Sequence, residues 1–145
     1  MQEAGLPPGA GFHLKRGERI YSVLVIAEKE VIGACLAEVL REHGFDVTVA
    51  ESFAVLSDAV KGRAQEAIDL VILTNTSIPP PRIRSIVPEI RARYPLARIV
   101  VLSGYCPDDF VADLMQRGIH GFLPLPYEQD ALLAELDGLL SMPTP

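Results

Sequence analysis

The polar residues with the most potential for chemistry follow a buried strand in the middle of the sequence. Ile68 to Leu73 form an apolar run that predicts a strand, and Thr74-Asn75-Thr76-Ser77 come directly after it, before three prolines. In open α/β sheets, sites form at the carboxyl ends of the strands. These side chains are hydroxyls and one amide, without an acid, a base or a metal ligand. They could bind a small anion or polar ligand, or they could bond to local amides in a turn.

The other reactive side chains are scattered along the chain. Cys35 and Cys106 lie 71 positions apart and are expected to be two free thiols of a reducing cytosol. His120 is expected to be an isolated histidine at an edge. Asp108 and Asp109 stand where a helix would begin, so stabilisation by the helix dipole explains them. We therefore expect neither a metal centre nor a cofactor.

Apolar periodicity divides the rest of the chain into alternating strands and helices. Pro88 interrupts the third helical pattern, so we expect regular helix to begin only near this residue, after an irregular turn. The first helix should bury a stripe made of Val31, Ile32, Cys35, Leu36, Val39 and Leu40. The predicted strands are 21–27, 45–50, 68–73, 97–103 and 120–124, and the predicted helices are 30–43, 52–63, a segment ending near 94, 107–117 and 128–140.

This (βα)5 order predicts a three-layer α/β/α fold with a parallel five-stranded sheet. The flavodoxin-like strand order 2-1-3-4-5 is one of the two common solutions, and it is the one that we expect. We expect a flexible leader over residues 1–19, one domain over 20–141 and a frayed tail over 142–145. A site would then be lined by the strand ends, which carry Ala27-Glu28, Thr74 to Ser77, Ser103-Gly104 and Pro124-Leu125-Pro126.

Composition restricts the classes of partner. The chain has 145 residues, 49% of them hydrophobic, and a formal net charge of −6. Bulk negative charge argues against binding to nucleic acid or to an anionic membrane. No apolar run approaches the roughly 18 residues that span a bilayer, and the N-terminus lacks the apolar core of a signal peptide. We therefore expect a cytoplasmic protein whose partners are other proteins.

Five local patterns, taken together in order and spacing, resemble the receiver domain of bacterial two-component response regulators, the fold of the chemotaxis regulator. The resemblance covers about residues 21–140 and rests on VLVIAEKE, GFDVTVAES, DLVILT, IVVLSG and RGIHGFLPLPY. In that family an Asp ending strand 3 accepts a phosphoryl group from a phosphohistidine, and two acids after strand 1 hold Mg²⁺. A Ser or Thr after strand 4 and a Lys after strand 5 contact the phosphoryl oxygens.

The resemblance places most of these parts on residues that cannot perform the reaction. The acid pair falls on Ala27 and Glu28, the acceptor on Thr74 and the lysine on Leu125. The hydroxyl is kept as Ser103, and Pro126 keeps the proline that follows the lysine in the family. Family receivers also have a switch aromatic in strand 5 that moves together with the hydroxyl on phosphorylation, and this position falls on Phe122. Glu28 alone would hold Mg²⁺ weakly, and a threonine without an adjacent base is a poor nucleophile.

These positions predict a degenerate receiver, or pseudo-receiver, that is not an enzyme and acts without Asp phosphorylation. We expect it to bind a protein partner through the face formed by the fourth helix, the fifth strand and the last helix, about residues 105–140. A homodimer through the same face stays open. Because about five residues follow the last helix, the chain should act by binding, unless a longer product continues into an effector domain. The alternative is a small-ligand-binding or vestigial enzyme domain that uses Glu28, Thr74 to Ser77 and Ser103.

Overall fold

The computed structural model describes residues 20–27, 31–50, 68–75 and 79–141. Its strands are β1 (Ser22–Ile26), β2 (Asp46–Ala50), β3 (Leu70–Asn75), β4 (Arg98–Ser103) and β5 (Gly121–Pro124). The helices in these ranges are α1 (Val31–Glu42), α3 (Pro80–Arg93), α4 (Asp108–Arg117) and α5 (Gln129–Leu140). The expected leader, tail and helix over 52–63 lie outside the described residues. No described helix is long and apolar enough to cross a membrane.

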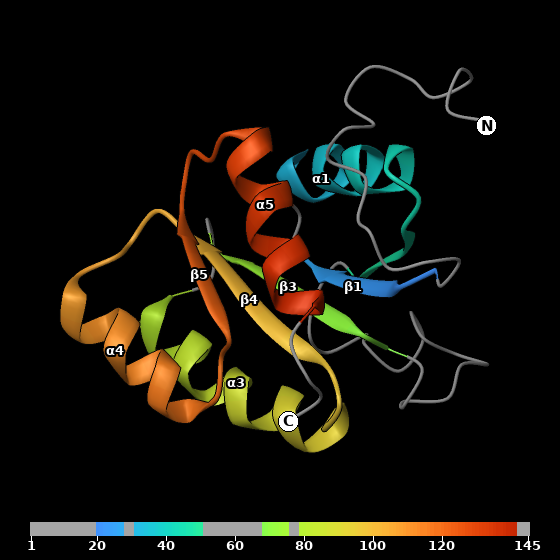
Figure 1. Ribbon diagram of the computed structural model, residues 1–145. Coiled ribbons are helices and arrows are strands. Elements are labelled where there is room, and N and C mark those ends of the chain that lie inside the picture. The colour runs from blue at the N-terminus through green and yellow to red at the C-terminus, as the bar shows by residue number, and fades with distance from the viewer. Residues whose placement is uncertain (1–19, 28–30, 51–67, 76–78, 142–145) are drawn as a thin grey trace, which may run out of the picture.

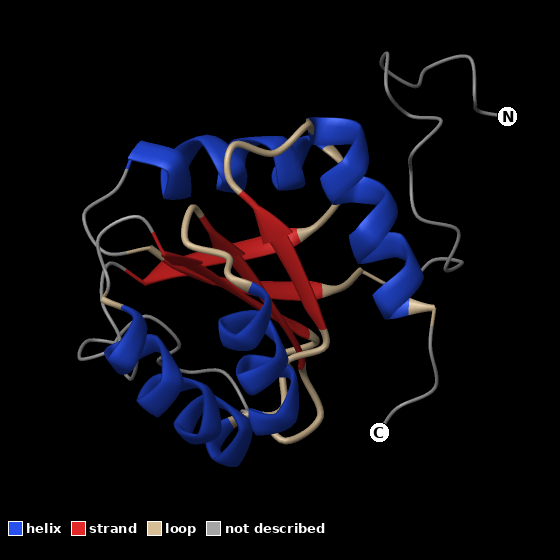
Figure 2. Cartoon of the chain, turned by 90° about the vertical axis from the view of Figure 1, so that its left-hand side faces the viewer, coloured by secondary structure: helices blue, strands red, loops and turns tan. Residues whose placement is uncertain are grey.

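The strands form one parallel sheet in the order β2-β1-β3-β4-β5, which confirms the predicted fold class. The described helices α3 and α4 cover one face of this sheet, and α1 and α5 cover the other (Figures 1 and 2). Strands β3 and β4 lie inside the sheet and are covered on both faces. This double burial explains why their sequences are continuous apolar runs without a polar alternation.

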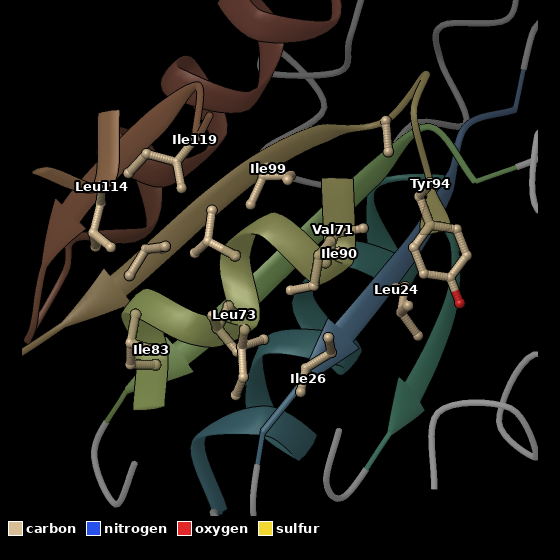
Figure 3. Packing of buried hydrophobic residues seen from close by; sticks show 14 of the residues in the cluster. Leu24, Ile26, Val71, Leu73, Ile83, Ile90, Tyr94, Ile99, Leu114 and Ile119 are labelled. Carbon is tan, nitrogen blue, oxygen red and sulfur yellow. The ribbon is translucent and has the colours of Figure 1, made fainter. Parts of the chain in front are cut away.

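Successive residues of each strand enter opposite cores. Val71 and Leu73 pack with α3 and α4, whereas Leu70 and Ile72 pack with α1 and α5. Figure 3 shows the first core, where Ile83 and Ile90 of α3 lie over the strands. Burying each of these side chains contributes about 1.5–3 kcal/mol relative to leaving it exposed, so both cores hold the helices against the sheet.

Helix α1 is rotated relative to the predicted apolar stripe. Cys35 is exposed, and the buried side chains of this helix include Leu36, Ala37 and Leu40. The expectation that Cys35 would be buried is therefore wrong. The cause is a close approach at Gly33, where a Cβ would lie 2.5 Å from the Cβ of Ala27 at the end of β1. A helix that approaches a strand this closely must turn its smallest residue toward the sheet.

Helix α3 begins at Pro80 and continues through Pro88, so the predicted late start is also wrong. Pro80 and Pro81 occupy the first helical positions, where a missing N–H costs nothing. Pro88 cannot bond to the carbonyl of Arg84, four residues earlier. That oxygen instead accepts a hydrogen bond from Nη1 of Arg117 in α4, at 3.1 Å. A neighbouring helix thus replaces the bond that proline removes.

Candidate functional site

The carboxyl ends of β1, β3, β4 and β5 bring the predicted site positions to one edge of the sheet. Ile26 pairs with Leu73, and Asn75 pairs with Ser103, so the ends of these strands are adjacent. Ser103 in turn pairs with Pro124, and the N–H of Leu125 donates to the Ser103 carbonyl at 2.9 Å. Strand β3 extends to Asn75, two residues beyond the predicted end, because both added residues pair with β4.

Thr74 is completely buried at the end of β3. Its hydroxyl donates a long hydrogen bond of 3.5 Å to the carbonyl of Ile26 in the neighbouring strand β1. This bonding agrees with the expectation that the Thr74 hydroxyl is satisfied by backbone. Thr76 and Ser77 lie outside the described residues, as does the side chain of Asn75.

The β1 side of this edge is closed by α1. Ala27 is 3% exposed and lies against Gly33, at a separation that leaves no space for a Cβ on that glycine. Glu28, the remaining acid of the expected pair, lies outside the described residues. Among the residues that the structure does describe, no three side chains of His, Cys, Asp or Glu are grouped so that they could hold a metal ion.

Ser103 is buried and bonded to the backbone of the loop that follows β4. Its hydroxyl donates to the carbonyl of Tyr105 at 2.8 Å and accepts from the N–H of the same residue at 3.0 Å. The backbone of Tyr105 therefore occupies the single donor and one acceptor position of the Ser103 hydroxyl, and these two bonds hold the hydroxyl in a tight turn.

Leu125 and Pro126 follow β5 at the same edge. Leu125 is partly buried and packs against the core on the α1 and α5 side, while Pro126 is exposed. The peptide bond between them is cis. An apolar side chain at this position contributes to packing and offers neither charge nor hydrogen bonds to an anion.

Three aromatic rings run from the loop after β4 to β5. Tyr105 contacts Phe110 edge to face with centroids 5.1 Å apart, and Phe110 contacts Phe122 in the same manner at 6.4 Å. The guanidinium of Arg84 lies 5.1 Å from the centre of the Phe110 ring. Phe122, the expected switch aromatic, is therefore half-buried in a packed row of rings.

An ionic cluster joins α3 to α4 beside this aromatic row. Oδ2 of Asp113 lies 2.7 Å from Nε of Arg84, and Oδ1 of Asp113 lies 3.0 Å from Nε of Arg117. The hydrogen bond from Arg117 is the main cause that lowers the pKa of the Asp113 carboxyl. This cluster sits on the surface and serves to align the two helices.

Two other candidates lie at the opposite, amino-terminal edge of the sheet. Nδ1 of His120 accepts the N–H of Ile99 at 3.0 Å, and burial, followed by the charges of Arg98 and Arg91, lowers the pKa of His120. Oδ2 of Asp69 accepts the N–H of Ser22 at 2.9 Å. Both side chains therefore connect strands and are remote from the candidate site.

Three features of this region were not predicted. They are the closure of Gly33 on Ala27, the turn of Ser103 with Tyr105, and the ionic cluster of Arg84, Asp113 and Arg117. The spacing of Ser103 and Tyr105 is typical of a serine turn, and Asp113 and Arg117 have the i, i+4 spacing of a helical ion pair. The contact of Gly33 with Ala27 and the bond from Arg117 to the Arg84 carbonyl join different elements, and no local sequence pattern indicates them.

Comparison with known proteins supports the receiver fold. No family model matches the chain. A Rickettsia bellii protein named as an NtrX-like response regulator is 25% identical over 118 residues, which cover 79% of this chain and 23% of that protein. The chain thus matches less than a quarter of the length of this relative.

Solved structures give the clearer likeness. A response regulator from Thermotoga maritima superposes with a TM-score of 0.73 at 22% identity, covering 86% of this chain and 100% of that one. The chemotaxis protein CheY4 of Vibrio cholerae gives a TM-score of 0.70 at 21% identity, covering 83% and 99%. The chain therefore has the fold of a response regulator receiver domain, the CheY-like form of the flavodoxin-like fold.

Proposed function

We propose that this chain is a pseudo-receiver of two-component-type signal transduction, which binds a protein partner without Asp phosphorylation. The observation that carries the proposal is Thr74, which is buried at the end of β3 with its hydroxyl bonded to backbone. A receiver that works by phosphorylation needs a carboxylate nucleophile there. A buried threonine without an adjacent base does not supply one.

The surroundings of Thr74 support the same proposal. A cation would be needed to offset the charge of a transferred phosphoryl group, yet Ala27 is packed against Gly33 and Leu125 is apolar. A Burkholderia pseudomallei response regulator of similar fold is described with a phosphorylated aspartic acid and a calcium ion, at a TM-score of 0.68 and 22% identity. At the positions that the receiver resemblance assigns to one acid of the pair and to the acceptor, this chain has Ala27 and Thr74, so we propose that it binds neither the phosphoryl group nor the ion.

The proposal is tested by titrating the protein with Mg²⁺ and beryllofluoride, a phosphoryl mimic, while amide NMR signals are followed. We expect no saturable shift at Ala27, Thr74, Ser103 or Leu125. A second aliquot treated with acetyl phosphate should show no mass increase. Saturable shifts that need both reagents together would show a working acceptor site and would overturn the proposal.

A further inference from the structure

We propose that the outer surface of α4, β5 and α5 binds a positively charged protein segment and does not pair with a second copy of this chain. This inference rests on the proposed docking function and adds the chemistry of the partner. We define the docking surface as β5 together with Val111 and Met115 of α4 and Ala131, Glu135 and Gly138 of α5.

Helix α4 turns one side toward α3 and another toward the docking surface. Asp113 and Arg117 define the α3 side, because Asp113 pairs with Arg84 and Arg117 bonds to the Arg84 carbonyl. The buried residues of α4 are Phe110 and Leu114. At 100° per residue, Val111 and Met115 lie on the other side of these two residues, facing away from α3. Met115 is 43% exposed, which is unusual for a large apolar side chain in this chain. Helix α4 therefore presents apolar area to the docking surface.

Helix α5 completes the surface on the other side of β5. A Cβ at Gly121 of β5 would lie 2.8 Å from Oε2 of Glu135, so the Glu135 carboxylate lies over this strand. Ala131 and Gly138 are exposed on the neighbouring turns, and the position of a Cβ on Gly138 meets nothing within 4 Å. The small residues Ala131 and Gly138 thus add little side-chain volume on either side of Glu135 along α5.

The charge of this part of the chain is one-sided. Residues 105–140 contain seven acidic residues and one arginine, so they account for the whole formal charge of −6, and the rest of the chain is neutral. No lysine or arginine follows Arg117 in the sequence. Arg117 itself is engaged by Asp113 and by the Arg84 carbonyl on the α3 side. Among the residues that define the docking surface, Glu135 supplies a carboxylate and none is a lysine or an arginine.

This distribution disfavours a symmetric dimer. In a two-fold interface the same patch meets itself, so the Glu135 carboxylates of both copies would enter one interface without a lysine or arginine of the docking surface to offset them. Like charges across an interface are repulsive. A partner segment with lysine or arginine around an apolar strip matches both features. Its cations would meet Glu135 and the acidic residues Asp108 and Glu128 at the adjoining helix starts, and its apolar strip would cover Met115.

The test uses a short amphipathic helical peptide with leucine on one side and lysine on the other, and a matched peptide in which every lysine is replaced by glutamate. We expect the lysine peptide to shift the amides of Val111, Met115, Phe122 and Glu135. Affinity should fall about tenfold or more between about 50 mM and 300 mM NaCl. The glutamate peptide should not bind. Equal binding of both peptides would overturn the proposal.

Charge-reversal variants locate the effect. Glu128→Lys with Glu135→Lys should reduce the affinity for the lysine peptide at least about tenfold. The control pair, Glu38→Lys with Glu42→Lys in α1, changes the net charge by the same amount at exposed positions elsewhere. It should change the affinity for the lysine peptide less than about twofold. If both pairs weaken binding equally, attraction is only through total charge and the docking surface is wrong.

Two further outcomes separate this inference from the proposed function. Sedimentation of the unliganded protein should show a monomer, and a dimer that Met115→Asp dissociates would identify a second copy as the occupant. Peptide binding at the docking surface that requires Mg²⁺ and beryllofluoride would overturn phosphorylation independence and leave the basic partner standing. Loss of peptide selectivity without any response to beryllofluoride would overturn the basic partner alone.

Discussion

Thr74 and Ser103 are polar residues whose hydroxyls are already bonded to backbone. Thr74 donates to the carbonyl of Ile26, and Ser103 bonds both backbone groups of Tyr105. A hydroxyl that donates to a ligand must give up the bond that it donates to the backbone, and the exchange returns only a modest net free energy. The hydrogen bonds of Thr74 and Ser103 therefore favour a packed edge of the sheet over a catalytic or ligand-binding edge.

The first prediction concerns an acidic side chain introduced at position 74. Thr74→Asp should lower the free energy of unfolding by several kcal/mol at pH 8, because an ionised carboxylate would be buried among strand ends whose described residues supply no cation. The loss should be smaller at pH 5, since burial raises the pKa of such a carboxyl and the neutral form is less costly. Urea unfolding at both pH values measures the effect.

The control for this prediction is Thr74→Val, which removes the hydroxyl and adds no charge. It should cost about 1 kcal/mol and show no added pH dependence. If Thr74→Asp is instead as stable as the native chain and gains stability with Mg²⁺, the acidic site of the resemblance is still intact.

The second prediction concerns His120. Its Nδ1 accepts the N–H of Ile99, and burial, with Arg98 and Arg91, lowers its pKa from the ordinary 6.5. The unfolded chain thus binds the proton more tightly than the folded chain. The stabilisation is complete above about pH 6.5 and is lost as the pH falls toward the lower pKa of the folded state.

Urea unfolding between pH 7.5 and 5 should show this loss in the native chain. His120→Asn can keep an acceptor near the position of Nδ1 without titrating, so the variant should lose part of the pH dependence. An unchanged dependence in His120→Asn would show that other groups cause it.

At the scale of elements, close packing and ionic contacts place the helices around the site. Gly33 lets α1 approach the end of β1, and the contact with Ala27 closes that side of the edge. Arg117 reaches from α4 to the carbonyl of α3 that Pro88 leaves without its helical partner. Neither device involves an apolar stripe, so neither follows from hydrophobic periodicity.

A matched pair of glycine substitutions tests the approach of α1. Gly33→Ala should lower the melting temperature, because its Cβ would lie 2.5 Å from that of Ala27 and the helix would have to shift. Gly138→Ala in α5 meets nothing within 4 Å and should raise stability by roughly 0.5–1 kcal/mol through helix propensity. Both changes are made in helix interiors, so propensity alone predicts the same sign.

Rescue of Gly33→Ala by Ala27→Gly would confirm that the two Cβ atoms collide. If Gly33→Ala is as stabilising as Gly138→Ala, α1 does not approach β1 as closely as described.

A double-mutant cycle tests the contact between α4 and α3. Arg117→Met should reduce the free energy of unfolding by about 1 kcal/mol, because the Arg84 carbonyl loses its donor. Pro88→Ala restores an N–H that can bond to that carbonyl within the helix. In the Pro88→Ala background the same Arg117→Met change should therefore cost less. Additive effects of the two substitutions would mean that Arg117 does not compensate for the proline.

At the scale of the whole molecule, the parallel sheet separates two cores and the charge is distributed unevenly. Helices α3 and α4 cover one core, and α1 and α5 cover the other (Figure 1). The basic residues of α3, Arg82, Arg84, Arg91 and Arg93, contrast with the acidic run over residues 105–140. The electrostatic potential should therefore be more negative on the side of residues 105–140 than on the side of α3, and this difference favours the approach of a cationic segment to the acidic side.

The sequence alone determined the strands and most helix ends, because buried parallel strands are continuous apolar runs and glycines end helices. The observed strand order is the expected one of two common solutions. It also identified Thr74, Ser103 and Leu125 as neighbours, because strand ends meet at one edge of a parallel sheet. The tertiary structure decided the rotation of α1, the continuity of α3 through Pro88 and the turn that holds Ser103. Two of these outcomes depend on contacts between different elements, Gly33 of α1 with Ala27 after β1 and Arg117 of α4 with the Arg84 carbonyl of α3. Local propensity and periodicity do not register such contacts, since their free energy exists only once the elements have packed.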